Sequence, residues 1–255
     1  MAVLDLKKFS GLVLSFDGTD LVSQEGSVEC GDKMTMKIDE MRPQLLNTDL
    51  FCPVIFYSIF RGVDRKSLLK RKNLQFDMVV IPQNLAGIEY VKTKGMNIGD
   101  FPVLLEVVQG YATLIMQTAE CTSVEGEMKA VVIKLKRGEK YVIPPKTDFI
   151  FVNTRQSSSI VAMFYSAKAT FETKFDRTRG SSLYIIRKNA RQEIVQNPYF
   201  RNVNRVRACR PEELYRIYGL TAKTPIFKQI LRKYDRFRWL HDSSKVDWTK
   251  IPLCG

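Results

Sequence analysis

The sequence contains a single histidine, His241, and no pair of cysteines at C-x-x-C spacing. A mechanism that needs two or more imidazole groups is therefore excluded. The five scattered cysteines fit neither a disulfide framework nor a zinc cluster and are typical of reduced thiols, so we expect an intracellular, cytoplasmic protein. No apolar run approaches the roughly 18–20 residues of a membrane-spanning helix. The N-terminal stretch has a charge within its apolar part and no small-residue cleavage site, which is not the pattern of a signal peptide.

The chain of 255 residues is 45% hydrophobic, enough for one large core or two small ones, and its net charge of +13 is unevenly distributed. Residues 1–50 carry 5 basic and 9 acidic side chains, whereas residues 187–255 carry 16 basic and 6 acidic ones. A basic segment of this kind is either a solvated face or a surface for an acidic partner. No nucleic-acid-binding motif accompanies it, so nucleic-acid binding through the tail is an alternative without a motif, and we expect no membrane association.

Short β-rich runs recur between about residues 53 and 175, separated by Gly, Pro, Asn and Asp at short intervals. That pattern predicts a mainly β sandwich or barrel. We expect an N-terminal extension over 1–50, a barrel domain over 51–185 and a basic, partly helical tail over 186–255, with helices beginning near Pro211 and Pro225. The strands predicted for the barrel are 54–60, 76–81, 87–92, 103–108, 112–117, 130–135, 140–143, 149–152 and 160–165.

The stretch 138–153 has a specific spacing of turn and strand residues. Gly138 suits a turn, Pro144 and the proline after it fix an extended entry to the next strand, and Asn153 suits a strand end. This spacing resembles the second motif of the cupin superfamily, a glycine followed at fixed intervals by Pro-x-Gly, a histidine and an asparagine. The second glycine of that motif is replaced here by Lys146.

A second stretch, residues 87–98, is G-I-E-Y-V-K-T-K-G-M-N-I, and Glu106 and Gly110 follow it. It resembles the G-x-E-x-x-x-T-K-G-H-x-H segment and the downstream E-x6-G of the cupin-type glucose-6-phosphate isomerases of archaea and bacteria. The resemblance spans roughly residues 53–200. It implies a cupin jelly-roll barrel of two antiparallel sheets, which commonly dimerises through an edge strand or a sheet face.

The metal site of that family is not retained in this sequence. In the family, two histidines, a later histidine and a glutamate hold a divalent metal that polarises the sugar carbonyl. The corresponding positions are Met96, Ile98, Phe149 and Val103, and a further family histidine position falls near Phe171. None of the first four is an ordinary ligand of a hard or borderline metal. We therefore expect no metal and no cofactor, and an apolar core where the family has its metal cavity.

Two carboxylates are weak candidates for a catalytic base. Glu89 and Glu106 are considered because enolisation without a metal would still need a positioned base. Side chains three residues apart on a strand point to opposite faces, so Glu106 points out of the barrel if Val103 points in. We therefore name no catalytic residue with conviction.

Thr93-Lys94-Gly95 is the remaining candidate for a sugar-phosphate site. The resemblance implies that the threonine hydroxyl and the glycine N–H contact the substrate phosphate, while the lysine adds charge. The alternative is that these residues form a strand end and turn with a structural role only. We favour this alternative because the metal ligands are lost.

Three hypotheses for function follow. The favoured one is a catalytically degenerate cupin that acts as a binding or assembly subunit, a homodimer or part of a larger assembly, so that we lean towards a non-enzyme. The second is a non-catalytic sugar-phosphate-binding module. The third is an active glucose-6-phosphate isomerase with relocated chemistry. Phosphosugar binding without turnover would select the second, and a stable macromolecular partner without sugar binding would select the first.

Overall fold

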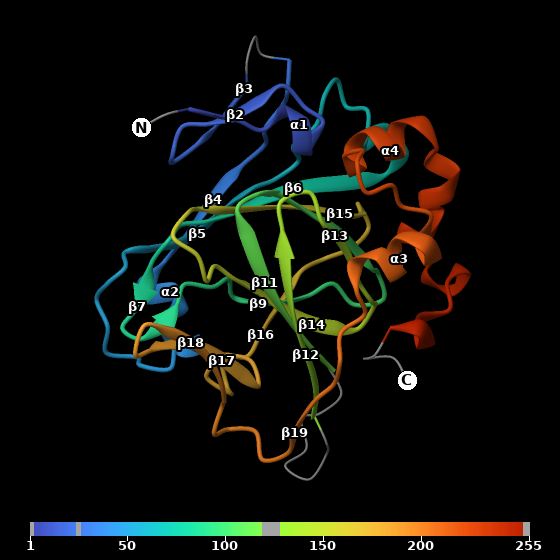
Figure 1. Ribbon diagram of the computed structural model, residues 1–255. Coiled ribbons are helices and arrows are strands. Elements are labelled where there is room, and N and C mark those ends of the chain that lie inside the picture. The colour runs from blue at the N-terminus through green and yellow to red at the C-terminus, as the bar shows by residue number, and fades with distance from the viewer. Residues whose placement is uncertain (1–2, 24–26, 119–127, 252–255) are drawn as a thin grey trace.

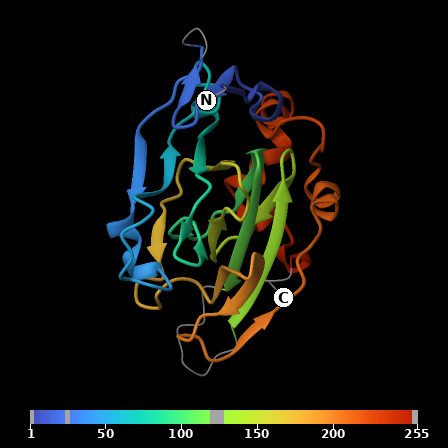
Figure 2. The ribbon, with the colours of Figure 1, turned by 60° about the vertical axis from the view of Figure 1, so that its left-hand side comes forward.

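The computed structural model describes residues 3–23, 27–118 and 128–251, and within them the chain is mainly β. Two six-stranded sheets face one another and enclose the main hydrophobic core, while helices and a hairpin cover their outer faces (Figures 1 and 2). Every strand pair between residues 74 and 166 is antiparallel. The prediction of a jelly-roll barrel built from two antiparallel sheets is confirmed. None of the helices in the described residues has the length and apolarity that crossing a bilayer takes.

We call the first of these sheets the helix-covered sheet. Its strands, in spatial order, are β13 (Lys140–Ile143), β10 (Val103–Gln109), β15 (Ser159–Ser166), β6 (Leu74–Ile81), β5 (Ile55–Phe60) and β4 (Lys33–Lys37). The β15–β6 ladder is long and unbroken, and the β10–β15 ladder shifts register after Val107. The outer face packs on α3 (Pro211–Tyr218) and α4 (Ile226–Arg232), where Phe76 stacks on Phe164 and lies 6.2 Å from Phe227, measured between ring centroids.

The second sheet is the hairpin-covered sheet. It contains β16 (Glu172–Lys174), β9 (Gly95–Asn97), β14 (Thr147–Val152), β11 (Tyr111–Thr118), β12 (Met128–Lys136) and β19 (Val203–Arg205). On its outer face Ile150 and Ile115 form a small separate core with Leu183 and Ile185. Those two residues belong to β17 (Leu183–Lys188), which pairs with β18 (Arg191–Gln196) in a four-stranded sheet completed by β8 (Glu89–Tyr90) and β7 (Leu85–Ala86).

The segments before and after the barrel pack into the same core as the two sheets. Leu6, Leu12 and Leu14 from the N-terminal part, and Leu214 and Ile226 from the C-terminal part, are all buried in it. The remaining elements are β1 (Leu4–Asp5), α1 (Lys7–Ser10), β2 (Leu14–Phe16), β3 (Leu21–Ser23), α2 (Ile38–Met41) and the 3₁₀ helices η2 (Arg42–Gln44), η3 (Lys70–Lys72), η4 (Tyr234–Leu240), η5 (Ser243–Lys245) and η6 (Trp248–Lys250).

Eight of the nine predicted strands coincide with strands of the two large sheets, and both predicted helices form. The ninth, 87–92, is strand only at Glu89–Tyr90 and belongs to the four-stranded sheet. The β17–β18 hairpin was not predicted, and it lies largely within the segment expected to be a basic, partly helical tail. The residues before 50 also contribute β4 to the barrel rather than remaining irregular. The boundaries proposed at 50 and 185 stay a prediction.

Candidate functional site

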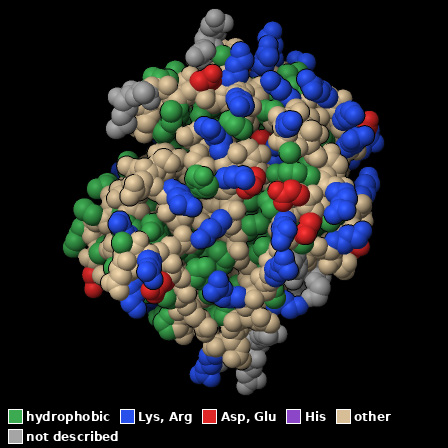
Figure 3. Space-filling model, in the orientation of Figure 1, with side chains coloured by type: hydrophobic (Ala, Val, Ile, Leu, Met, Phe, Trp, Pro, Cys, Tyr) green, Lys and Arg blue, Asp and Glu red, His purple; other side chains and the backbone are tan. Residues whose placement is uncertain are grey.

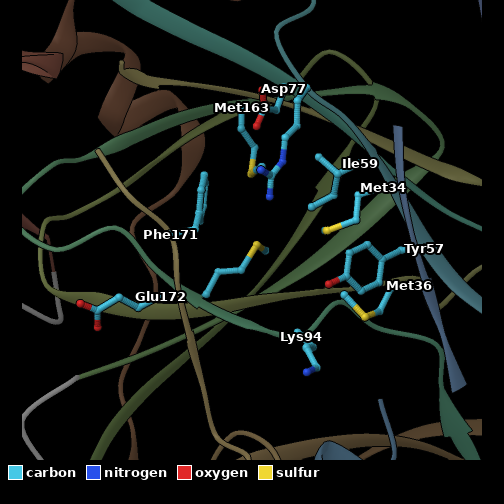
Figure 4. A pocket seen from close by; sticks show the side chains of 11 residues that line it. Met34, Met36, Tyr57, Ile59, Asp77, Lys94, Met163, Phe171 and Glu172 are labelled. Atoms are coloured by element: carbon cyan, nitrogen blue, oxygen red, sulfur yellow. The ribbon is translucent and has the colours of Figure 1, made fainter. Parts of the chain in front are cut away.

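A cavity of about 170 Å³ lies between the two sheets. The helix-covered sheet supplies most of its wall from β4, β5, β6 and β15, and the hairpin-covered sheet supplies β9 and the start of β16 (Figure 4). Four methionines surround it, accompanied by aromatic, aliphatic and charged side chains. The lining residues are Met34, Met36, Tyr57, Ile59, Arg61, Asp77, Lys94, Met96, Met163, Phe171 and Glu172.

Strand alternation explains why these side chains meet. Residues two apart on a strand share a face, and directly paired residues on neighbouring strands do too. Met36 is paired with Tyr57, and Met34 with Ile59, so β4 and β5 present one continuous inner face. Asp77 on β6 is likewise paired with Met163 on β15, so these two side chains share a face. The apolar alternation of the sequence therefore builds the cavity wall directly.

The buried carboxylate of Asp77 is fully engaged by neighbouring donors. Its Oδ1 accepts hydrogen bonds from the backbone N–H of Gly62 at 2.9 Å and from Nε2 of Gln75 at 3.0 Å. Its Oδ2 accepts the Tyr165 hydroxyl at 2.6 Å, and Tyr165 is itself mostly buried, which together with Asp77 raises the pKa of that hydroxyl well above its usual value. Asp77 is thus a structural anchor of the cavity wall.

Two cations line the cavity. Arg61 follows β5 and is exposed, and Lys94 precedes β9 and is half-buried. Among the described residues neither side chain has a carboxylate oxygen within 4.0 Å. Burial raises the pKa of Tyr57 to about 12, while the backbone of Lys94 and, less, the charge of Arg61 lower it. The cavity lining therefore holds two cations without an ion-pair partner among the described residues, together with the carboxylates of Asp77 and Glu172.

The four positions at which the sequence resemblance places metal ligands are apolar and buried. Met96 lines the cavity, and Phe149 is its partner in the β9–β14 ladder. Phe149 packs edge-on against Phe151, and Ile98 and Val103 are in the main core. No group of three or more His, Cys, Asp or Glu side chains suited to a metal occurs in the described part of the chain. These residues do not fit the divalent metal of the family.

Thr93, Lys94 and Gly95 do not converge on one ligand position. The Thr93 hydroxyl is fully buried and accepts a hydrogen bond from the backbone N–H of Phe151 at 3.1 Å. The Gly95 N–H donates to Oε1 of Gln44 at 2.9 Å, so it too is occupied within the fold. Only Lys94 reaches the cavity.

Glu89 and Glu106 also lie apart from the cavity. Glu89 pairs with Lys92 and accepts the N–H of Leu46 at 2.9 Å. Glu106 pairs with Lys140 at 3.0 Å and accepts the N–H of Ile226 at 2.7 Å, so it points outward to α4, as strand alternation predicts. Burial raises the pKa of Glu106 to about 7, against the opposing effects of Lys140 and Ile226. Both carboxylates have structural partners, and neither faces a place for a substrate.

His241 is also remote from the cavity lining. Its Nε2 lies 3.0 Å from the Tyr234 hydroxyl and its Nδ1 lies 3.2 Å from the Ser166 hydroxyl. Burial lowers the pKa of His241, so the imidazole is held neutral in a hydrogen-bonded link between η4 and the end of β15. These contacts fit a structural role for His241.

Sequence reasoning missed the residues that give the cavity its polarity. Asp77 had a detectable signal, since a lone carboxylate in the middle of an apolar predicted strand has to find partners. The signal for Arg61 was weaker, because Arg61 belongs to a run of basic residues and is the member of that run that lines the cavity. The periodicity of the sequence does not distinguish Arg61 from the other members of the run.

Comparisons with known proteins give one family. The family model described as "Glucose-6-phosphate isomerase (GPI)" matches residues 39–201, which is more than half of the chain. No curated protein sequence matches the chain significantly.

Solved structures resemble about half of the chain at low TM-scores. The vicilin from Solanum melongena is 19% identical, with a TM-score of 0.37 and coverage of 47% of this chain and 31% of that one. Oxalate decarboxylase from Bacillus subtilis is 8% identical, with a TM-score of 0.35, and the match covers 46% of this chain and 28% of the decarboxylase. The Cnp3 cupin domain of Schizosaccharomyces pombe is 8% identical, with a TM-score of 0.30, and the match covers 46% of this chain and 65% of the cupin domain. The match spans about a third or less of the vicilin and the decarboxylase, and these TM-scores carry no argument about function.

Proposed function

The chain belongs to the glucose-6-phosphate isomerase family as a cupin-type member, and on that premise we propose that it is a catalytically degenerate member that acts by binding. The observation that supports this proposal is the chemistry of the four metal positions. A thioether, two aliphatic side chains and a phenyl ring stand where the family has imidazoles and a carboxylate. Such side chains offer a divalent metal no charge and no strong lone pair.

The environment of these positions supports a stable replacement of the metal site rather than a damaged one. Phe149, Ile98 and Val103 are each at most 4% exposed, and they pack with both sheets. A lost ligand set usually leaves polar groups that need new partners. Here the surrounding side chains are apolar as well, so the barrel gains packing energy where a metal centre would need polar groups.

The buried carboxylates support the same proposal. Isomerisation requires a base within hydrogen-bond reach of a substrate carbon-bound proton. Glu89 and Glu106 both lie outside the cavity lining and are held by lysines and backbone N–H groups. Asp77, which shares the cavity wall with a second carboxylate, Glu172, already accepts three hydrogen bonds.

The partner is proposed to be a second copy of the chain or a larger assembly. Lysine and arginine side chains are spread over the face shown in Figure 3 and gather along the edge formed by the C-terminal helices. Interspersed like charges of this kind suit an acidic macromolecular surface. We include a nucleic acid among such surfaces, without a sequence motif that identifies one.

A sugar-phosphate-binding module is the second candidate, favoured by one observation. Arg61 and Lys94 both line the cavity without an ion-pair partner among the described residues. A phosphate group would supply that charge. The hydroxyl of Thr93 and the N–H of Gly95, which the family resemblance assigns to the phosphate, are however used inside the fold.

The test is interconversion of glucose 6-phosphate and fructose 6-phosphate by the purified full-length chain. It is run after chelation and again with manganese, iron, nickel or zinc, beside a cupin-type isomerase that retains the histidines as positive control. We expect no turnover above the protein-free blank under any condition. Turnover that depends on added metal would overturn the proposal, and metal-independent turnover would restore Glu89 or Glu106 as candidate bases.

Equilibrium dialysis against labelled glucose 6-phosphate distinguishes the two binding candidates. Saturable binding that is lost in Lys94→Gln, without turnover, would select the sugar-phosphate module. Absence of binding together with a stable dimer or complex in solution would support a subunit kept for its surface.

A further inference from the structure

We propose that the cavity between the two sheets binds a small carboxylic acid with an apolar body, of about the size of phenylacetate, and that Arg61 pairs with its carboxylate. This inference rests on the proposed non-catalytic binding function and names the ligand class of that same cavity. Three features carry it: the apolar wall, the size of the space and the position of an unpaired guanidinium.

Six of the eleven lining side chains are apolar, and four of these six are flexible methionines. Met34 and Met36 come from β4, Met163 from β15 and Met96 from β9, so thioether side chains approach the space from both sheets (Figure 4). Methionine is unbranched and polarizable, and it fits irregular apolar ligands, aromatic rings in particular. Ile59 and Phe171 complete this surface.

The size of the space sets the size of the ligand. The cavity measures about 170 Å³. An apolar cavity of roughly 150 Å³ is large enough to hold a benzene molecule. The space therefore accepts a single ring or a branched chain of similar volume with one polar group at the edge.

Arg61 supplies the polar end of the site. It is exposed and follows β5, so it reaches solvent and also lines the cavity together with Tyr57. The Tyr165 hydroxyl is committed to Asp77, whose two oxygens already accept three bonds. Asp77 therefore does not occupy the guanidinium, whose planar fork matches a carboxylate.

Tyr57 provides a second donor for the same carboxylate. Figure 4 shows its hydroxyl pointing toward the middle of the lining side chains, on the side where Lys94 lies. The hydroxyl keeps its proton at neutral pH, because burial raises the pKa of Tyr57 to about 12. A carboxylate beside Arg61 would accept from both groups, while the ring of the ligand contacts the methionines.

A sugar phosphate fits this space poorly. Each sugar hydroxyl that leaves water needs a hydrogen-bond partner, and an unmet one costs free energy. Four thioethers, Ile59 and Phe171 offer no strong donor or acceptor to such hydroxyls. An apolar body contacts these six side chains without needing hydrogen-bond partners, so this part of the lining favours a carboxylate with few other polar groups.

Calorimetric titration with phenylacetate tests the role of Arg61 at the polar end of the site. We expect saturable binding that weakens about 10- to 100-fold in Arg61→Gln, because a hydrogen-bonded ion pair is lost. Arg65→Gln is the matched control: Arg65 is exposed, lies four residues away and does not line the cavity. This control should bind within twofold of the unchanged protein. The neutral analogue 2-phenylethanol should bind at least tenfold more weakly than phenylacetate.

Methionine-methyl NMR locates the bound ring without a mutation in the wall. In protein labelled at the methionine methyl groups, phenylacetate should shift the signals of the four cavity methionines. Met41 and Met78, which are buried but do not line the cavity, are the internal controls and should not shift. Shifts confined to Met41, Met78 or surface signals would overturn the assignment.

The outcomes separate this inference from the proposed function. No binding of phenylacetate at millimolar concentration, or binding unchanged by Arg61→Gln, would overturn the ligand class and leave non-catalytic binding intact. Tighter, Arg61-dependent binding of glucose 6-phosphate would do the same and favour the sugar-phosphate module. Isomerase turnover would overturn the proposed function itself.

Discussion

The interior cavity and the outer shell of the barrel differ in whether their charged side chains form ion pairs. In the shell, each of the two buried carboxylates nominated from the sequence is matched with a lysine, Glu89 with Lys92 and Glu106 with Lys140, and all four side chains are at most 3% exposed. In the cavity, Arg61 has no carboxylate partner within the described residues. Fully paired charges hold elements together, whereas an unpaired charge at a cavity is available to a ligand.

Within one fold, this difference distinguishes charged side chains that hold elements together from a charged side chain that is available to a ligand. Lys140 donates to the carbonyls of Gly138 and Ala222 as well as pairing with Glu106, so it links β10 and the turn before β13 to the C-terminal segment. No comparable contact holds the Arg61 side chain within the described residues.

Removal of a shell carboxylate should have the largest effect. Glu106→Ala leaves Lys140 buried without its anion and the N–H of Ile226 without its acceptor, so we expect a loss of about 3–5 kcal/mol in the free energy of unfolding. Urea unfolding measures it. Glu193→Ala, which breaks an exposed pair with Lys188, should change stability by less than about 0.5 kcal/mol. A loss below about 1 kcal/mol in Glu106→Ala would show that the shell pair is dispensable.

The same carboxyl group should make stability depend on pH. Because burial raises the pKa of Glu106 from its ordinary 4.5 to about 7, the folded protein keeps a proton that the unfolded chain has released between those values. Its contribution to stability is therefore full below about pH 4.5 and declines as pH rises through 7. Unfolding free energies measured across this range should fall more steeply in the unchanged protein than in Glu106→Gln. Parallel pH profiles would contradict the burial-dominated pKa.

The hydroxyl of Thr93, the residue before the cavity-lining Lys94, provides a further test of the comparison. Thr93→Val removes the acceptor of the buried N–H of Phe151, so we expect a loss of about 1–3 kcal/mol, while Thr93→Ser keeps the hydroxyl and most of the stability. Thermal and urea unfolding provide the measurement. Ligand affinity of folded Thr93→Val should stay unchanged; a selective loss of phosphate binding would instead assign Thr93 to a ligand site.

Arg61→Gln should have the smallest effect on stability. The side chain is exposed and has no ion-pair partner in the described part of the chain, so a change within about 0.5 kcal/mol is expected. Differential scanning calorimetry without ligand measures it. A large loss would mean that Arg61 is a structural charge like those of the shell, and the contrast between the two regions would disappear.

The barrel strands could be predicted from the sequence because their signal is local. Alternating or continuous apolar runs bounded by Gly, Pro, Asn and Asp gave β5, β6, β10 and β15 to within about two residues. The β17–β18 hairpin was missed because Leu183–Lys188 has only a short apolar run and stands at the start of the basic segment. The apolar side chains of this hairpin pack on Ile115 and Ile150 of the neighbouring sheet, a long-range contact that the local sequence does not reveal.

The candidate site was less predictable because its contacts are long-range. The loss of metal ligands at Met96 and Phe149 followed from motif spacing, and the outward direction of Glu106 from strand alternation. The use of the Gly95 N–H by Gln44, which precedes it by 51 residues, has no local signal. The selection of Arg61 from a run of basic residues depends likewise on where β5 ends against β4 and β6.

The bond from Ile226 to Glu106 joins residues 120 positions apart, and it has a consequence for synthesis of the chain. All strands of the helix-covered sheet have left the ribosome well before α4 is made, yet the buried charges of Glu106 and Lys140 have their covering partners only in the last sixth of the chain. The outer face of that sheet therefore stays exposed to solvent until α4 has been made. A nascent chain stalled before residue 226 should expose this face to chaperones, and emergence of α4 should cover it.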